Sequence, residues 1–356
     1  MKHKILYLLA TVSCLFSCAG EAGTPESLTS GEDGLLSIDF EEAALTRSVG
    51  NNPLATGTLF KVYAYNQGTD IRNTTVPVAE GTYAIGEADD GSSNKKQTIT
   101  VYNSKALKLY AGTYDLYFVS YNSTSETPSV TDASAAPSLI TALPNGKDFL
   151  YTTMKNIGVR SVNAGDTNFL ITLNKPFERM CSGLLFKVKA KDGTHPVTPR
   201  SLRLMSIKVS HLSASCDFLL GSSVLPVFSA ADKYTGTLSY GTGNTPDAGF
   251  RNNNGTVSAS GVITTAIPEA GIYQVLPTNG SATLEIDVVL EVGYGETTVT
   301  KTNYPYHITV NKALQAGNCY ELTFSLTFYD SYVPDNLELD ILPYIPSQQD
   351  TGHVGG

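Results

Sequence analysis

Alternation of apolar and polar side chains is the strongest pattern in this chain, and it is clearest near the N-terminus. Leu36, Ile38 and Phe40 alternate with Ser37 and Asp39. Side chains of an extended strand point to opposite faces in turn, so this spacing predicts a strand with one apolar and one polar face. We call residues 36–40 the leader strand, and we expect its apolar face to be buried.

A single basic residue follows the leader strand. Arg47 is the first Lys or Arg after Cys18, and we expect it to lie in an exposed link between two strands. A trypsin-like or arginine-specific protease would then cut between Arg47 and Ser48. The pattern predicts a strand that proteolysis could detach.

The rest of the chain consists of short runs rich in β-formers, separated by Gly, Pro, Asn and Asp, which predicts an all-β protein built as a sandwich. The runs are residues 58–65, 97–102, 113–121, 149–153, 168–173, 184–190, 202–210, 256–265, 271–276, 282–292, 297–302 and 320–328. Residues 123–144 are rich in Ser, Thr, Ala and Pro, and we expect a long surface loop there, either functional or an insertion without a role. Residues 222–255 are expected to be a loop containing one short strand.

Two places share one turn pattern. Leu109 to Tyr114 and Leu314 to Tyr320 each contain Ala-Gly and open into a strand with an aromatic residue at its start. A glycine lets the chain reverse before such a strand. This repetition indicates two sandwiches of one kind, with a domain boundary between residues 178 and 179.

The N-terminus carries an export signal. Lys2 and Lys4 precede an apolar run, residues 5–16, that is too short to span a bilayer but suits a secretory signal peptide. The run ends at Cys18 in a sequence that resembles the bacterial lipobox, in which the cysteine becomes the lipidated first residue. The alternative is an ordinary signal peptide that is cut elsewhere.

Composition and charge exclude some functions. Of 356 residues, 41% are apolar and 16% are charged, which is typical of a globular chain, and the formal net charge of -9 argues against nucleic acid as a partner. After Cys18, three cysteines remain: Cys181, Cys216 and Cys319. Their spacing suits neither a zinc site nor a redox pair, so we expect buried thiols, with one disulfide as the alternative.

The sequence resembles the fimbrillins, the pilin subunits of type V pili in Bacteroidales. The resemblance rests on the lipobox at Cys18, the leader strand with Arg47, the turn before Tyr114, the linker around Arg179, and Leu276-Pro277 with the turn before Tyr320. It implies two tandem transthyretin-like β-sandwich domains. The expected parts are a signal peptide at 1–17, a lipidated leader at 18–47 removed by proteolysis, sandwiches at 48–178 and 179–346, and a polar tail at 347–356.

The resemblance also implies polymerisation by strand exchange, in which a strand from another subunit fills the groove that the leader strand leaves. Leu337, Leu339 and Ile341 repeat the alternation of the leader strand and are the candidate donor. The alternative is that they belong to the last strand of their own domain. The implied partners are other pilin subunits, including further copies of this chain, an anchor and a tip, with the outer membrane through the lipid of the precursor.

The sequence offers no candidate catalytic residues, metal ligands or cofactor site. His195, His211, His307 and His353 form no metal-ligand pair and flank no nucleophile motif. We therefore expect a structural protein of cell-surface fimbriae, with a role in adhesion or biofilm formation toward a host or bacterial surface. The alternative is a permanently anchored lipoprotein that binds glycans on tyrosine faces, although strand tyrosines such as Tyr114 and Tyr117 are expected in the core.

Overall fold

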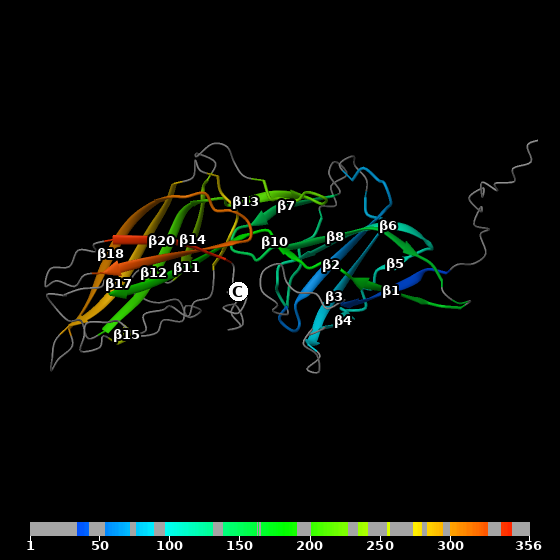
Figure 1. Ribbon diagram of the computed structural model, residues 1–356, viewed down its shortest axis with the longest axis horizontal. Coiled ribbons are helices and arrows are strands. Elements are labelled where there is room, and N and C mark those ends of the chain that lie inside the picture. The colour runs from blue at the N-terminus through cyan, green and yellow to red at the C-terminus, as the bar shows by residue number, and fades with distance from the viewer. Residues whose placement is uncertain are drawn as a thin grey trace, which may run out of the picture. The chain divides into compact units, whose positions relative to one another are not determined.

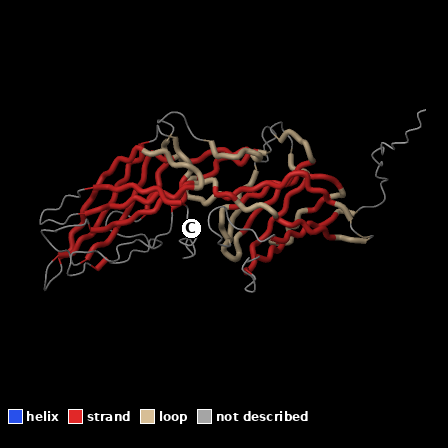
Figure 2. Tube along the Cα trace, viewed as in Figure 1, coloured by secondary structure: helices blue, strands red, loops and turns tan. Residues whose placement is uncertain are grey.

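The computed structural model confirms an all-β fold. It describes residues 34–42, 54–71, 76–88, 97–130, 138–161, 163, 165–190, 201–226, 234–240, 255–256, 273–279, 283–294, 300–326 and 336–343. These residues form strands and loops without a helix (Figure 2). In this part of the chain there is consequently no helix that could cross a membrane.

Ten strands precede residue 180 (Figure 1). They are β1 (Leu36–Glu42), β2 (Leu59–Asn66), β3 (Ala79–Ala88), β4 (Gln97–Val101), β5 (Lys108–Leu109), β6 (Gly112–Ser120), β7 (Leu139–Pro144), β8 (Leu150–Val159), β9 (Asn168–Leu173) and β10 (Glu178–Arg179). Three of them form a sheet of order β5-β1-β9, and six form a sheet of order β10-β8-β6-β2-β3-β4.

The remaining strands form two more sheets. They are β11 (Ser182–Ala190), β12 (Ser201–Leu212), β13 (Ser215–Leu219), β14 (Gly236–Tyr240), β15 (Gly255–Thr256), β16 (Tyr273–Val275), β17 (Thr283–Tyr294), β18 (Thr300–Asn311), β19 (Asn318–Leu326) and β20 (Asn336–Pro343). One sheet has the order β16-β11-β19-β20, and the other has the order β14-β12-β17-β18 with β15 beside β12.

The first two sheets enclose one hydrophobic core. The three-stranded sheet contributes Leu36, Ile38 and Phe40 to it, and the six-stranded sheet contributes Phe60 and Phe118, all at most 4% exposed. Two sheets that bury their facing side chains against each other make a β-sandwich. The leader strand is therefore part of the core of this sandwich.

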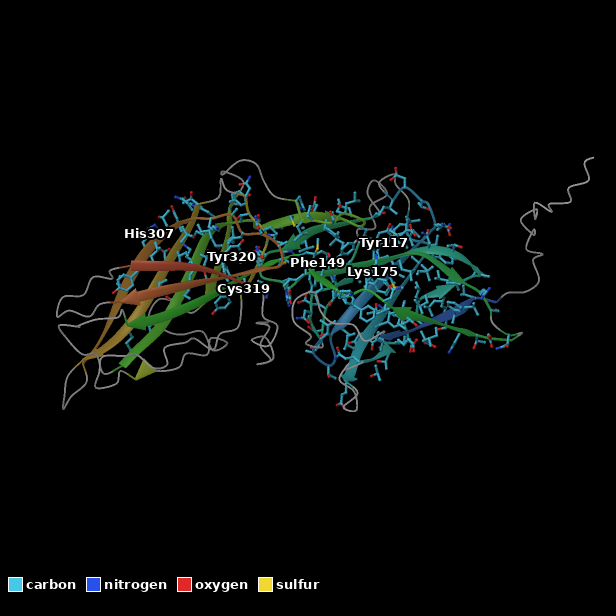
Figure 3. The ribbon with its side chains drawn as sticks, viewed as in Figure 1. Tyr117, Phe149, Lys175, His307, Cys319 and Tyr320 are labelled. Carbon is cyan, nitrogen blue, oxygen red and sulfur yellow. The ribbon has the colours of Figure 1, made fainter. Side chains whose placement is uncertain are left out.

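The six-stranded sheet is also covered on its other face. β7 pairs with β13, and these two strands pack Ile140 and Phe218 against Tyr117 and Phe149, which are labelled in Figure 3. Along β6 the side chains from Tyr114 to Ser120 are all buried. A strand that is covered on both faces has no exposed side, which explains why its sequence is continuously apolar and aromatic.

Several expectations can be compared with these elements. The expected loop at 123–144 is wrong in its last part, because β7 occupies residues 139–144 and buries Ile140 and Leu143. The short strand expected within 222–255 is β14. Most of the run at 256–265 and the tail at 347–356 lie outside the described residues.

The boundary expected between residues 178 and 179 falls inside β10, which still pairs with β8 of the first sandwich. Residues 35–356 group as one compact unit, and residues 1–34 as another. The division into two tandem domains therefore stays a prediction.

Candidate functional site

The candidate site is the position of β1 in its sheet. β1 pairs with β5 in the antiparallel sense, with Leu36 opposite Leu109 and Ser37 opposite Lys108. On its other side it pairs with β9 in the parallel sense over its whole matched length, from Ser37 opposite Asn168 to Glu42 opposite Leu173. β1 is thus the central strand of its sheet, and it is the only connection between β5 and β9 in that sheet.

The three inward side chains of β1 are buried as the alternation predicts. Leu36 and Ile38 are 0% exposed and Phe40 is 4% exposed, whereas Leu35, just before the strand, is 45% exposed. Burying each side chain of this size contributes roughly 1.5 to 3 kcal/mol to stability. The leader strand therefore contributes substantially to the stability of the first sandwich.

Phe40 lies among aromatic rings from three strands. Its ring centroid is 4.8 Å from that of Tyr83, 5.5 Å from Phe118 and 6.4 Å from Phe60, and all three pairs are edge-to-face. Such geometry is favoured because the positive edge of one ring meets the negative face of another. We call the space between β5 and β9, with Phe60, Tyr83 and Phe118 as its floor, the β1 groove.

The hydroxyl of Tyr83 lies between β1 and the segment before β5. It donates to the carbonyl oxygen of Ile38 at 2.7 Å and accepts from the backbone N-H of Leu107 at 2.9 Å. The carbonyl of Leu107 in turn accepts from the N-H of Ile38 at 2.8 Å. A single side chain thereby satisfies two buried backbone groups that the short β5 ladder leaves unpaired.

Burial raises the pKa of the Tyr83 phenol far above its usual value, so the hydroxyl keeps the proton that it donates to Ile38. The approach of the chain to Tyr83 requires Gly81. A Cβ at that position would lie 2.4 Å from the backbone nitrogen of Leu107, closer than real Cβ contacts. Glycine there is consistent with close approach of two backbone segments.

The outward face of β1 is acidic and partly exposed. Ser37 and Asp39 are half-buried and Glu41 is exposed. The Thr172 hydroxyl donates to the Glu41 carboxylate at 2.6 Å. Lys108 faces outward on β5, opposite Ser37, so an acidic residue in place of Ser37 would meet a cation across the strands.

The first strand of the following sheet occupies an equivalent position. β11 pairs with β16 in the antiparallel sense and with β19 in the parallel sense, as β1 does with β5 and β9. β11 is continuous with the chain on both sides, whereas β1 is the first described strand of the protein. Of these two central strands, β1 is the one that a cut at Arg47 would separate from the strands that follow it.

The other residues singled out in the sequence have different outcomes. Cys18, Arg47 and Ser48 lie outside the described residues. Leu337, Leu339 and Ile341 lie on β20, which pairs antiparallel with β19 in the same chain, with Leu339 opposite Leu322. This arrangement corresponds to the alternative of a last strand within its own domain, and donation to another subunit stays a prediction.

The cysteine prediction is confirmed, because Cys181, Cys216 and Cys319 are free and buried. Burial raises the thiol pKa of Cys181 and of Cys216 to about 12, so both stay protonated and unreactive at neutral pH. Cys181 follows directly on an ion pair between Arg179 and Asp148, with contacts of 2.5 and 2.6 Å and both side chains less than 10% exposed. The segment around Arg179 is therefore packed.

Tyrosines and possible metal ligands were also considered in the sequence. Tyr114 and Tyr117 are buried, as expected for core residues, and their rings are covered by the protein itself. Within the described ranges, His, Cys, Asp and Glu side chains form no group of three that could hold a metal ion.

The walls of the β1 groove were not found from the sequence. Tyr83 lies on β3, which was not among the expected strands, because Gly81 and Gly86 interrupt its pattern. The alternation of Thr82, Tyr83, Ala84 and Ile85 is a signal that could have identified it. Its pairing with Ile38 depends on a contact 45 residues away in the chain.

Comparison with known proteins gives one family match. A family model described as fimbrillin-like matches residues 46–340. No curated protein matches the sequence.

Among solved structures, similarity is found to a fimbrial protein from Bacteroides vulgatus, with 11% identity, 87% of this chain and 99% of that chain covered, and a TM-score of 0.48. The tip fimbrial protein Mfa3 from Porphyromonas gingivalis, truncated at its C-terminus, has 11% identity, 87% and 100% coverage and a TM-score of 0.33. The anchor protein Mfa2 from the same organism has 9% identity, 86% and 96% coverage and a TM-score of 0.32.

Proposed function

The chain belongs to the fimbrillin-like family, and on this premise we propose that it is a structural pilin subunit of a type V fimbria that polymerises by strand exchange. Family membership supports a fimbrial subunit role at the cell surface, in a family of structural and adhesin subunits and not of enzymes. The finer steps are export as a lipoprotein through Cys18, cleavage after Arg47 and donation of residues 337–341.

The observation that carries the proposal is the position of β1. It is the central strand of its sheet, it fills the core with Leu36, Ile38 and Phe40, and it precedes the first basic residue of the leader. Loss of β1 would leave the backbone groups of β5 and β9 unpaired above an apolar groove. A strand of matching alternation could restore both the ladder and the core by β-augmentation.

The candidate donor has the alternation that the groove requires. If Leu337 takes the place of Leu36, then Leu339 takes that of Ile38 and Ile341 that of Phe40. In the same register Glu338 takes the place of Ser37 and faces Lys108 across the strands. An opposite-charge pair across two strands is favourable, so this register gains a contact that the leader strand lacks.

Cleavage supplies the switch. While the chain is intact, the leader strand competes for the β1 groove at an effective concentration on the order of millimolar, because it is covalently joined to it. A donor at micromolar concentration would then be excluded even if its affinity were equal. After a cut at Arg47, the leader competes as a separate peptide, and a donor present on every neighbouring subunit has the advantage.

We expect Arg47→Gln to abolish conversion of the precursor to polymers. Wild-type precursor treated with an arginine-specific protease should form a ladder of SDS-resistant oligomers on gels, and the substituted protein should remain monomeric. Arg160→Gln, which removes another exposed arginine, is the matched control and should still form the ladder.

A second variant tests the donor. Deletion of residues 336–356 should leave the cleaved protein monomeric, because the groove is then open but no strand can be donated. Clean cleavage after Arg47 that yields only monomer, together with no effect of the deletion, would contradict the proposal.

A further inference from the structure

The three inward positions of the β1 groove differ in what surrounds them. Leu36 and Ile38 are aliphatic, and the backbone of Ile38 is held by Tyr83 and Leu107. Phe40 instead meets three aromatic rings edge-to-face, with centroids within 6.4 Å. We call the space that its side chain fills the Phe40 subsite.

The Phe40 subsite has the shape and electrostatics of an aromatic ring. Phe40 is 4% exposed, so its volume is enclosed by protein. Edge-to-face contacts depend on the quadrupole of a ring, which an aliphatic side chain does not have. A branched aliphatic residue there would lose these contacts and leave part of the enclosed volume empty, and close-packed cores are sensitive to such voids.

The C-terminal segment of this chain does not carry an aromatic residue at the corresponding position. In the register that places Leu337 and Leu339 at the first two inward positions, Ile341 reaches the Phe40 subsite. A shift by two residues would bring Pro343 there instead, which lacks a backbone N-H for the ladder. The register with Ile341 is therefore the better of the two, yet it remains a mismatch.

We propose that the Phe40 subsite makes the β1 groove selective for a strand with an aromatic side chain at its third inward position. The preferred partner is an extended segment of another pilin chain with the pattern aliphatic-x-aliphatic-x-aromatic. A second copy of this chain binds the same groove more weakly through Ile341. This inference rests on the proposed strand exchange and specifies which donor the groove favours.

The selectivity has a consequence for assembly. The leader strand fits the groove better than the chain's own C-terminal segment does, so cleavage at Arg47 alone does not expel it. The cleaved leader stays bound until it is diluted away or displaced. A donor with an aromatic third position displaces it at a lower concentration than this chain does.

The test is a displacement assay on the full chain without its signal peptide and without lipid. A dye on the Cys18 thiol marks the leader, because Cys181, Cys216 and Cys319 are buried. After cleavage at Arg47, confirmed by mass spectrometry, fluorescence anisotropy reports release of the labelled leader. The competitors are a peptide of residues 336–343 and the same peptide with Ile341→Phe.

We expect the Ile341→Phe peptide to displace the leader at about tenfold lower concentration than the unaltered peptide, a factor that corresponds to the loss of edge-to-face ring contacts. A peptide with Leu339→Phe is the matched control. It adds an aromatic ring at the second inward position, and it should displace the leader no better than the unaltered peptide.

A variant of the protein itself gives the reciprocal result. In precursor with Phe40→Ile, the cleaved leader should be displaced by the unaltered peptide at about tenfold lower concentration than in the wild type. Equal displacement by the unaltered and Ile341→Phe peptides would overturn the selectivity while leaving strand exchange intact. If even an unlabelled peptide of residues 35–42 failed to exchange with the labelled leader, the groove would not exchange strands and the proposed function would itself be wrong.

Discussion

Phe40→Ala is expected to lower the free energy of unfolding of the intact precursor by about 3–5 kcal/mol. The substitution removes a ring that is 4% exposed and that contacts the rings of Phe60, Tyr83 and Phe118. The loss has two parts, the transfer free energy of the ring and the cavity left among rigid aromatic neighbours. Urea unfolding followed by circular dichroism measures the effect as a shift of the transition.

Two comparisons show whether the loss comes from the leader strand. Glu41→Ala alters the same strand on its exposed face, where only the bond from Thr172 is lost, and should cost less than about 1 kcal/mol. In assembled protein that has lost residues 18–47, the Phe40→Ala difference should vanish. A cost below about 1 kcal/mol for Phe40→Ala in the precursor would mean that β1 does not contribute to the core as described.

Asp148→Ala is expected to destabilise the protein by about 3–5 kcal/mol. Asp148 is 2% exposed in its side chain and bonds Arg179 through both carboxylate oxygens, and it also accepts from the Asn122 amide at 2.9 Å. Removing the carboxylate leaves the Arg179 guanidinium buried without that partner. The free energy of unfolding in urea again gives the magnitude.

The double substitution Asp148→Leu with Arg179→Met is the informative control for this pair. It removes both charges, so much of the stability lost in Asp148→Ala should return. The pair of Lys61 and Glu80 offers a comparison at the surface, because Glu80 is 52% exposed. Lys61→Met should cost less than about 1 kcal/mol, since exposed ion pairs contribute little. An equally small effect of Asp148→Ala would show that Asp148 and Arg179 are solvated.

The leader strand could be predicted from the sequence because its information is local. Alternation over residues 36–40 sufficed to assign which side chains of β1 are buried. The bounds of β9, residues 168–173, were also predicted from such a run. β7 was missed because its neighbourhood is rich in Ser, Thr, Ala and Pro, and its partner β13 comes more than 70 residues later.

The groove could not be predicted, because its floor is assembled from strands far apart in the chain. Phe60, Tyr83 and Phe118 lie on β2, β3 and β6, and nothing local in their sequences shows that they meet Phe40. The repeated turn pattern was informative in a different way from that expected.

The tyrosine that follows each of these turns does bond back to the turn. The Tyr114 hydroxyl donates to the Tyr110 carbonyl at 3.0 Å, and the Tyr320 hydroxyl accepts from Gln315 at 2.8 Å. The strands that they start, β6 and β19, nevertheless occupy different places in their sheets. The equivalent strands are β1 and β11.

The most direct test of strand exchange is a pair of disulfide-trapping experiments on β20. In a single chain Glu338 lies opposite Thr323 of β19, whereas in the proposed polymer it lies opposite Lys108 of another subunit. Cysteines at directly opposite positions of paired strands are close enough to form a disulfide. The precursor with Thr323→Cys and Glu338→Cys should therefore form a link within one chain before cleavage.

The measurement is non-reducing gel electrophoresis of the protein with Lys108→Cys and Glu338→Cys, oxidised before and after cleavage at Arg47. The strand-exchange account predicts a ladder of disulfide-linked chains that appears only after cleavage. If no link between chains formed, and the 323–338 pair still closed within one chain after cleavage, the C-terminal strand would have stayed in place and the account would be contradicted.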